Sequence, residues 1–234
     1  MSAAARMLLS ILIPTLASRA ALYQRLTSEL RRQIESAGLQ SEVEILGLCD
    51  DGAVPVGAKR NTLLRQAQGQ YVVFTDDDDQ VSAGYVSLIA QALRANPGID
   101  CLGIRVLIYF RGAHPSEATH SIQYTDLSSK AGRYFRPPYI LNPIRRDIAI
   151  RYPFAEVRYS EDFDWAMRMV RDRALQREVM IEPVLYHYYS RRRWLYQWLL
   201  DQSEPLRHAL GLRMDKRLTF WRRIKGSDSQ TPSA

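Results

Sequence analysis

Short apolar runs and helical spacings alternate along the first third of the chain. Residues 7–13 form an apolar run, and apolar residues then recur at helical spacing up to a terminating Gly38. These residues are Leu22, Leu26, Leu30 and Ile34. Two more apolar runs, 43–48 and 71–74, enclose a short helical segment over residues 57–68. This order predicts an α/β, Rossmann-like fold with a mostly parallel sheet and helices on both faces.

The remaining pattern extends this domain and then changes character. Residues 101–110 predict another buried strand, whereas residues 111–138 are polar and lack periodicity, which indicates loops and short strands. We expect one α/β domain over residues 1–190. A helical extension, basic and aromatic-rich, is predicted for residues 191–225, and a disordered tail for residues 226–234.

Composition narrows the class of protein. A chain of 234 residues with 46% hydrophobic content buries one substantial core. Its two cysteines, Cys49 and Cys101, lie in strand-like runs and make no disulfide framework, so we predict a reducing, cytoplasmic location. No apolar stretch reaches the roughly 18 to 20 residues of a membrane span, which excludes a transmembrane segment but leaves peripheral membrane contact open.

The positive charge of the chain is concentrated near its end. The formal net charge is +7, and residues 191–225 alone carry ten Lys or Arg against three acids. Such a segment attracts an anionic partner such as nucleic acid, acidic lipid or a phosphorylated polymer. An ordinary solvated helix surface explains it equally well.

Acidic clusters follow two of the predicted strands. Asp50 and Asp51 come after the run 43–48, and four aspartates, Asp76 to Asp79, follow the run 71–74 directly. Packed carboxylates repel one another, and Mg²⁺ or Mn²⁺ held against a substrate diphosphate would offset the repulsion. The alternative is a solvated acidic turn.

Four segments of the chain form a recognisable set: Ile-Leu-Ile-Pro-Thr at 11–15, Gly-Ala-Lys-Arg-Asn at 57–61, the block 69–79 ending in the aspartates, and Ser-Glu-Asp at 160–162. Together they resemble the family 2 glycosyltransferases with the GT-A fold. Their order and spacing carry the resemblance, which covers roughly residues 7–190 and implies a soluble enzyme that uses a nucleotide-sugar donor.

The resemblance also implies a donor site with a metal ion, Mn²⁺ or Mg²⁺. Residues implied to contact the nucleotide are Pro14, Thr15, Asp50, Asp51, Arg60, Asp76 and Asp77. Metal ligands implied are Asp78, Asp76 and His187. The aspartate motif fits either 76-x-78 or 77-x-79; we prefer the first, because Thr75 completes the strand. The alternative for His187 is a packed histidine, which is the commoner case for a lone histidine among aromatic residues. For Lys59, a surface cation on the helix is a reasonable explanation.

The fourth of these segments, residues 160–162, implies a catalytic base. In the family, the acid at the position of Asp162 takes the acceptor proton, and Glu161 is the second candidate here. Ser160 and the acids of the first turn also fit plain helix capping.

We therefore predict transfer of a hexose-type sugar from a nucleoside diphosphate sugar, UDP-sugar favoured, with inversion. The acceptor is left open and includes a glycan, a lipid phosphate or modified DNA. A nucleotidyltransferase is the first alternative, although Leu-Ala-Ser-Arg at 16–19 lacks the glycines of its usual phosphate loop. The second is a non-catalytic polyanion-binding protein, which leaves the aspartates without a role.

Overall fold

The alternation of strands and helices expected from the sequence is present in the structure. A computed structural model describes residues 7–110 and 115–190, so the predicted extension and tail lie outside the described residues. The strands are β1 Leu9–Leu16, β2 Val43–Asp50, β3 Tyr71–Phe74, β4 Gln80–Val81, β5 Cys101–Phe110, β6 Ser116–His120, β7 Ser128–Lys130, β8 Arg133–Arg136, β9 Ile144–Arg145 and β10 Glu178–Ser190. The helices are a 3-10 turn Ala17–Arg19, α1 Ala20–Ser36, α2 Val56–Gln66, α3 Tyr85–Ala95, α4 Arg146–Ala149 and α5 Glu161–Arg171.

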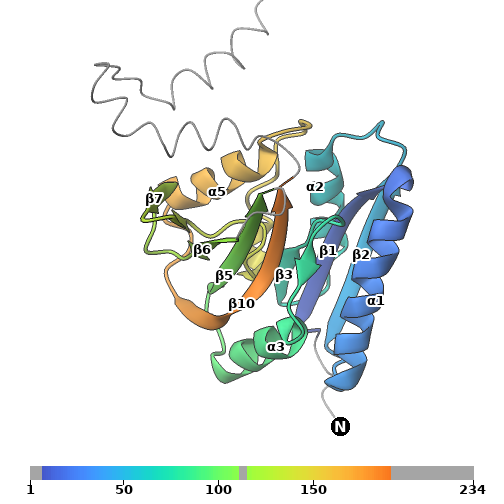
Figure 1. Cartoon of the computed structure of the whole chain (residues 1–234), viewed down its shortest axis with the longest axis horizontal. Helices are drawn as coiled ribbons and strands as arrows, with labels where there is room; N and C mark the ends of the chain where they lie inside the picture. The colour runs from blue at the N-terminus through green and yellow to red at the C-terminus, as the bar shows by residue number, and fades with distance from the viewer. Residues whose placement is uncertain (1–6, 111–114, 191–234) are drawn as a thin grey trace, which may run out of the picture. The chain divides into compact units, whose positions relative to one another are not determined.

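The first three strands, β1, β2 and β3, pair in parallel with one another at one end of the sheet (Figure 1). β1 is central: its Leu12 lies opposite Leu46 of β2 on one side and Phe74 of β3 on the other. Because these strands are parallel, their carboxyl ends reach one edge of the sheet, where α/β proteins place their sites. Right-handed connections from β1 to β2 and back past β1 to β3 put α1 and α2 on opposite faces.

The second half of the sheet is mixed. The strand order is β2-β1-β3-β9-β5-β6-β8-β7, and β10 pairs in parallel with β5. β6 and β9 are antiparallel to β5, and β10 also pairs antiparallel with β4, the two-residue strand that follows the acidic run. The predicted α/β class with a largely parallel sheet is confirmed, with antiparallel strands added beyond β3.

Helices α1 and α3 are joined by one buried glutamine. The side chain of Gln33 donates to the carbonyl of Ser82 at 2.9 Å and accepts from the backbone N–H of Val86 at 3.0 Å. The second bond satisfies a first-turn N–H of α3 that has no partner within the helix. Within the described part of the chain, no helix combines the length and apolarity needed to cross a membrane.

Candidate active site

The predicted site residues of β1, β2 and β3 meet at one sheet edge. Thr15 and Asp50 are close to the carboxyl ends of β1 and β2, and Asp76 lies two residues beyond β3. Pro14 is buried within β1, opposite Leu48 of β2. The parallel arrangement therefore brings these residues together as the sequence predicts. Pro14 differs from a residue exposed to ligand, because it is buried inside the sheet.

Burial alternates along the four aspartates. The side chains of Asp76 and Asp78 remain 32% and 19% exposed, whereas Asp77 and Asp79 are each 1% exposed. Both oxygens of Asp77 are engaged, by the Thr15 hydroxyl at 2.5 Å and by Nη1 of Arg19 at 2.8 Å. The exposed pair is the one in the 76-x-78 register.

Tyr186 of β10 holds both ends of the acidic run. Its hydroxyl accepts from the backbone N–H of Asp76 at 3.0 Å and donates to the Asp79 carboxyl at 2.9 Å. The N–H of Tyr189 donates to the other Asp79 oxygen at 2.8 Å. Burial, followed by the charge of Asp76, raises the pKa of Asp79 to about 8. Sequence reasoning missed Tyr186, because only the β4–β10 pairing brings it here.

Arginines offset the charge of the run. Arg19 lies 3.4 Å from Asp78 as well as bonding Asp77, and Arg60 lies 3.3 Å from Asp76. Side chains of the protein itself thus offset the mutual repulsion of the carboxylates, and the fold does not need a metal ion to accommodate them. The repulsion argument drawn from sequence does not by itself require a metal.

Arg60 is the residue on which the two halves of the site converge. Its side chain is 4% exposed; Nε donates to Glu161 at 3.1 Å, and Nη2 donates to Asp76 at 3.3 Å. The guanidinium lies 5.2 Å from the ring centroid of Phe74 and 6.0 Å from that of Phe154. Nη1 is buried and has no hydrogen-bond partner among the described residues. The sequence predicts Arg60 as a contact to the nucleotide. In the structure, its side chain links the end of β3 to the start of α5.

Glu161 and Asp162 have different surroundings at the start of α5. Glu161 is 3% exposed and paired with Arg60, and burial raises its pKa. Asp162 is partly exposed and accepts a hydrogen bond from the Tyr139 hydroxyl, whose pKa is raised by burial and then by the Asp162 charge. Burial raises the pKa of Asp76 too, and Asp162 adds to that rise. Asp162 is therefore the acid of this pair that lies near Asp76 and retains exposure.

The backbone before α5 is strained at a non-glycine residue. Ser160 has φ 67° in the left-handed region, and its side chain makes no capping hydrogen bond. The capping alternative for Ser160 is therefore wrong. Asn61, inside α2, holds the preceding loop instead: its amide exchanges two hydrogen bonds with the backbone of Phe154, at 2.9 and 2.7 Å.

Lys59 is buried, which corrects the expectation of a surface cation. It is 3% exposed, donates to the carbonyl of Thr15 at 2.7 Å and pairs with Asp50. The Lys59 hydrogen bond holds the pKa of Asp50 below its usual range. Asp51 is exposed and accepts from the N–H of Ala53 at 3.1 Å. Asp50 thus anchors the loop, and Asp51 is the carboxylate open to a ligand.

His187 is not brought to the aspartates. Because side chains alternate along a strand, His187 faces away from Tyr186, the residue that bonds Asp79. Its Nε2 lies 3.0 Å from the Ser82 hydroxyl and its Nδ1 lies 3.1 Å from the Tyr109 hydroxyl. Within residues 7–110 and 115–190, no three His, Cys, Asp or Glu side chains form a metal-binding group. Asp76 and Asp78 remain as two partly exposed carboxylates.

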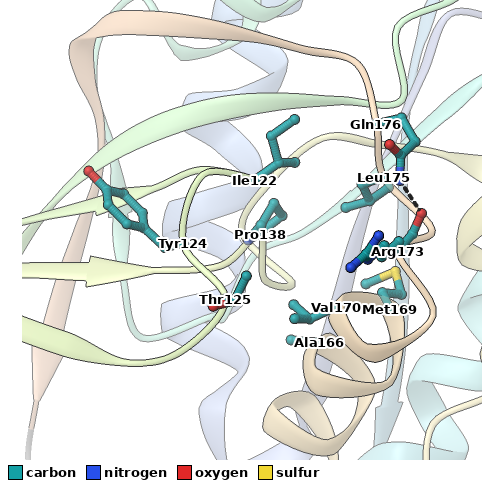
Figure 2. A pocket seen from close by; sticks show the side chains of 10 residues that line it. All are labelled: Ile122, Tyr124, Thr125, Pro138, Ala166, Met169, Val170, Arg173, Leu175 and Gln176. Atoms are coloured by element: carbon teal, nitrogen blue, oxygen red, sulfur yellow. Dashed lines mark hydrogen bonds between the residues drawn. The ribbon is translucent and has the colours of Figure 1, made fainter.

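A separate cavity of about 230 Å³ lies along α5 beyond Asp162 (Figure 2). It is lined by apolar side chains that include Ile122, Pro138, Ala166, Met169 and Val170. Ala166 is four residues after Asp162, and Pro138 directly precedes Tyr139. None of the predicted site residues lines this cavity.

Residues 55–155 match the model of glycosyl transferase family 2. The predicted family resemblance is confirmed over this segment. The family 2 segment contains Lys59, Arg60 and the acidic run, and ends before Asp162. Among curated proteins, no match was found.

Solved structures share the fold. TarS of S. aureus, residues 1–349 in complex with UDP, is 15% identical, with 79% of this chain and 61% of that chain covered and a TM-score of 0.51. A longer TarS structure is 16% identical over 79% of this chain and 37% of that chain, with a TM-score of 0.50. This chain therefore spans less than two thirds of the TarS chains that it matches.

The role of Arg60 predicts a large loss of stability when its charge is removed. Arg60→Met leaves buried Glu161 and partly exposed Asp76 without their shared cation, and removing one partner of a buried ion pair typically costs about 3 to 5 kcal/mol. Urea unfolding measures the change. Arg65→Met, an exposed cation on the same helix, is the control and should lie within about 0.5 kcal/mol of the unaltered protein. Equal stability of the two variants would contradict the link.

The raised pKa of Asp79 predicts a pH-dependent loss of stability. The folded protein holds the Asp79 proton up to about pH 8, against an ordinary value of 3.8. The contribution of protonated Asp79 to the free energy of unfolding is complete below its ordinary pKa and is lost as the pH rises through its pKa in the folded protein. The loss amounts to at most about 1.4 kcal/mol per pH unit. Relative to Asp79→Asn, which cannot ionise, the unfolding free energy of the unaltered protein should fall between pH 5 and 8. If the unfolding free energies of the unaltered protein and of Asp79→Asn changed in parallel with pH, the raised pKa of Asp79 would be contradicted.

Proposed function

We propose that the chain transfers a sugar from a nucleoside diphosphate sugar, UDP-sugar first among them, to an acceptor hydroxyl with inversion at the anomeric carbon. The observation that carries the proposal is the meeting, at one sheet edge, of partly exposed Asp76 and Asp78 with Asp162 from α5. Arg60 joins the two parts through Asp76 and Glu161. The family 2 match covers the acidic part of this site.

The donor side fits a divalent cation, Mn²⁺ or Mg²⁺. Asp76 and Asp78 alternate with two buried aspartates and expose carboxylate oxygens, the ligands that both ions prefer. Two protein carboxylates leave coordination positions for diphosphate oxygens and water. When bound, the cation would supply positive charge against the leaving diphosphate. Asp51, exposed beside the end of β2, is assigned to the nucleoside.

Asp162 is assigned as the general base. In the transfer, the acceptor oxygen attacks the anomeric carbon, the bond from that carbon to the diphosphate oxygen breaks, and the acceptor proton passes to Asp162. The Tyr139 hydroxyl holds one side of this carboxylate, which limits its rotation. Glu161 is committed to Arg60 and is assigned a positioning role.

UDP is the first nucleotide to test, since TarS of similar fold was solved with UDP. The nucleotidyltransferase alternative has no comparable support, because the matched family is a glycosyl transferase family. The acceptor remains a choice among a glycan, a lipid phosphate and modified DNA. The basic segment 191–225, on which an anionic acceptor was predicted, lies outside the described residues.

We expect the protein to release nucleoside diphosphate from one member of a nucleotide-sugar panel in the presence of Mn²⁺, since slow hydrolysis needs no acceptor. Asp78→Asn should abolish this release and the metal-dependent binding of the nucleotide, because it removes one exposed ligand. Calorimetric titration with UDP, with and without Mn²⁺, measures the second effect. Asp147→Asn, an exposed carboxylate on α4, is the control. Metal-dependent affinity that survives in Asp78→Asn would reject this ligand assignment.

Asp162→Asn should separate catalysis from donor binding. Loss of a general base lowers the rate typically by about 10² to 10⁴, while the base adds little to the ground-state complex. We expect donor hydrolysis to fall by this factor with UDP affinity unchanged. Asp164→Asn, in the same turn of α5 and paired with Arg168, provides the matched control. A near-normal rate in Asp162→Asn would contradict the assignment of Asp162 as the general base. Either another group would then take the proton, or the inverting mechanism would be wrong.

A further inference from the structure

Arg19 is a cation beside the acidic run, and the proposed reaction assigns no role to it. It ends the 3-10 turn that follows β1, and its guanidinium Nη1 contacts Asp77 at 2.8 Å and Asp78 at 3.4 Å. The Arg19 side chain is 39% exposed, unlike that of Arg60, which is 4% exposed. In the sequence, Arg19 stands far from the acidic run, and only the fold brings it to the aspartates.

The two aspartates that Arg19 contacts differ in freedom. Asp77 is buried and is also held by the Thr15 hydroxyl at 2.5 Å. Asp78 is partly exposed, and in the described part of the chain Arg19 is the cation paired with it. A divalent cation that binds Asp78 therefore has to compete with a guanidinium already present.

We propose that Arg19 couples the divalent cation to the donor diphosphate: it neutralises Asp78 in the absence of donor, and turns to the phosphate oxygens when nucleotide and cation bind together. This inference rests on the proposed function, because it assigns a residue to the same donor site. Asp77 keeps the arginine at the site in both states.

The chemistry of the guanidinium suits both roles. Its planar fork offers several N–H donors, and the contacts with Asp77 and Asp78 use Nη1 alone, so the exposed part of the fork can reach phosphate oxygens. The first turn of α1, directly after Arg19, contains no acidic residue and no side-chain cap, which favours an anion at this end of the helix. Each ligand thereby removes an obstacle to the other: the cation replaces Arg19 at Asp78, and the diphosphate accepts the released guanidinium.

The test compares Mn²⁺ binding with and without UDP in the full chain, followed by the electron paramagnetic resonance signal of free Mn²⁺. In Arg19→Met we expect Mn²⁺ alone to bind about tenfold more tightly, because its competitor is gone. UDP should then strengthen Mn²⁺ binding about tenfold less than in the unaltered protein, within the usual range of coupling between sites. Arg19→Lys, which keeps the charge, should lie between the two.

Arg25→Met is the matched control. Arg25 lies on α1, the helix that begins directly after Arg19, and contacts the acidic run through the Asp79 carbonyl at 3.0 Å, so its removal changes the net charge equally without freeing a carboxylate. Its effect on Mn²⁺ binding should stay within about twofold, since the Arg25 side chain is exposed and water screens its charge. An equal effect of Arg25→Met and Arg19→Met would reduce Arg19 to general electrostatics and overturn the proposal.

The outcomes separate this inference from the proposed function. Metal-dependent UDP binding with the same coupling in Arg19→Met as in the unaltered protein overturns the role of Arg19 alone. An unaltered protein that binds neither Mn²⁺ nor any nucleotide of the panel overturns the donor site and this coupling together. Circular dichroism of each variant establishes that the fold is retained.

Discussion

A buried guanidinium between two carboxylates is the interaction on which the site depends. Arg60 joins Asp76, beyond β3, to Glu161, the first residue of α5. Its neighbours on α2 act in other directions: Lys59 ties the carbonyl of β1 to the end of β2, and Asn61 holds the backbone of the loop before α5. Three consecutive polar residues of one short helix thus join β1, the end of β2, the acidic run and the start of α5.

Burying these groups costs free energy that hydrogen bonds and ion pairs only partly return. Desolvation of charged pairs often matches or exceeds their attraction, so such pairs contribute less to stability than apolar side chains of the same size. Charged pairs do, however, disfavour alternative packings, because any such packing would leave a buried charge without a partner. The close approach of Gly57 points the same way: a Cβ there would lie 1.9 Å from the carbonyl of Ala155. We infer that the contacts of this region fix the positions of its residues more than they stabilise the fold.

Much of this arrangement follows from the sequence, and its limits have physical causes. Apolar runs that end in Asp50 or Asp76 mark strand ends, and parallel pairing then brings those ends together. The local pattern cannot tell which polar residue of a helix finds a buried partner, since the partner comes from a distant strand; Lys59 was misplaced for this reason. The direction of the His187 side chain depends on the pairing of β10 with β4 and β5, which the local sequence does not reveal. Glu161 and Asp162 are neighbours in sequence, and only their tertiary partners separate their roles.

The alternation within the acidic run has a structural cause. Its backbone is anchored at Asp76 by the Tyr186 hydroxyl and, after Asp79, by the β4–β10 pairing. Between these anchors, Asp77 and Asp79 point to buried partners, which leaves Asp76 and Asp78 toward the open edge. Sites that stabilise charge are effective when their groups are held before the ligand arrives, because no free energy is then spent on arranging them. The two buried aspartates thus fix the direction of the two partly exposed ones.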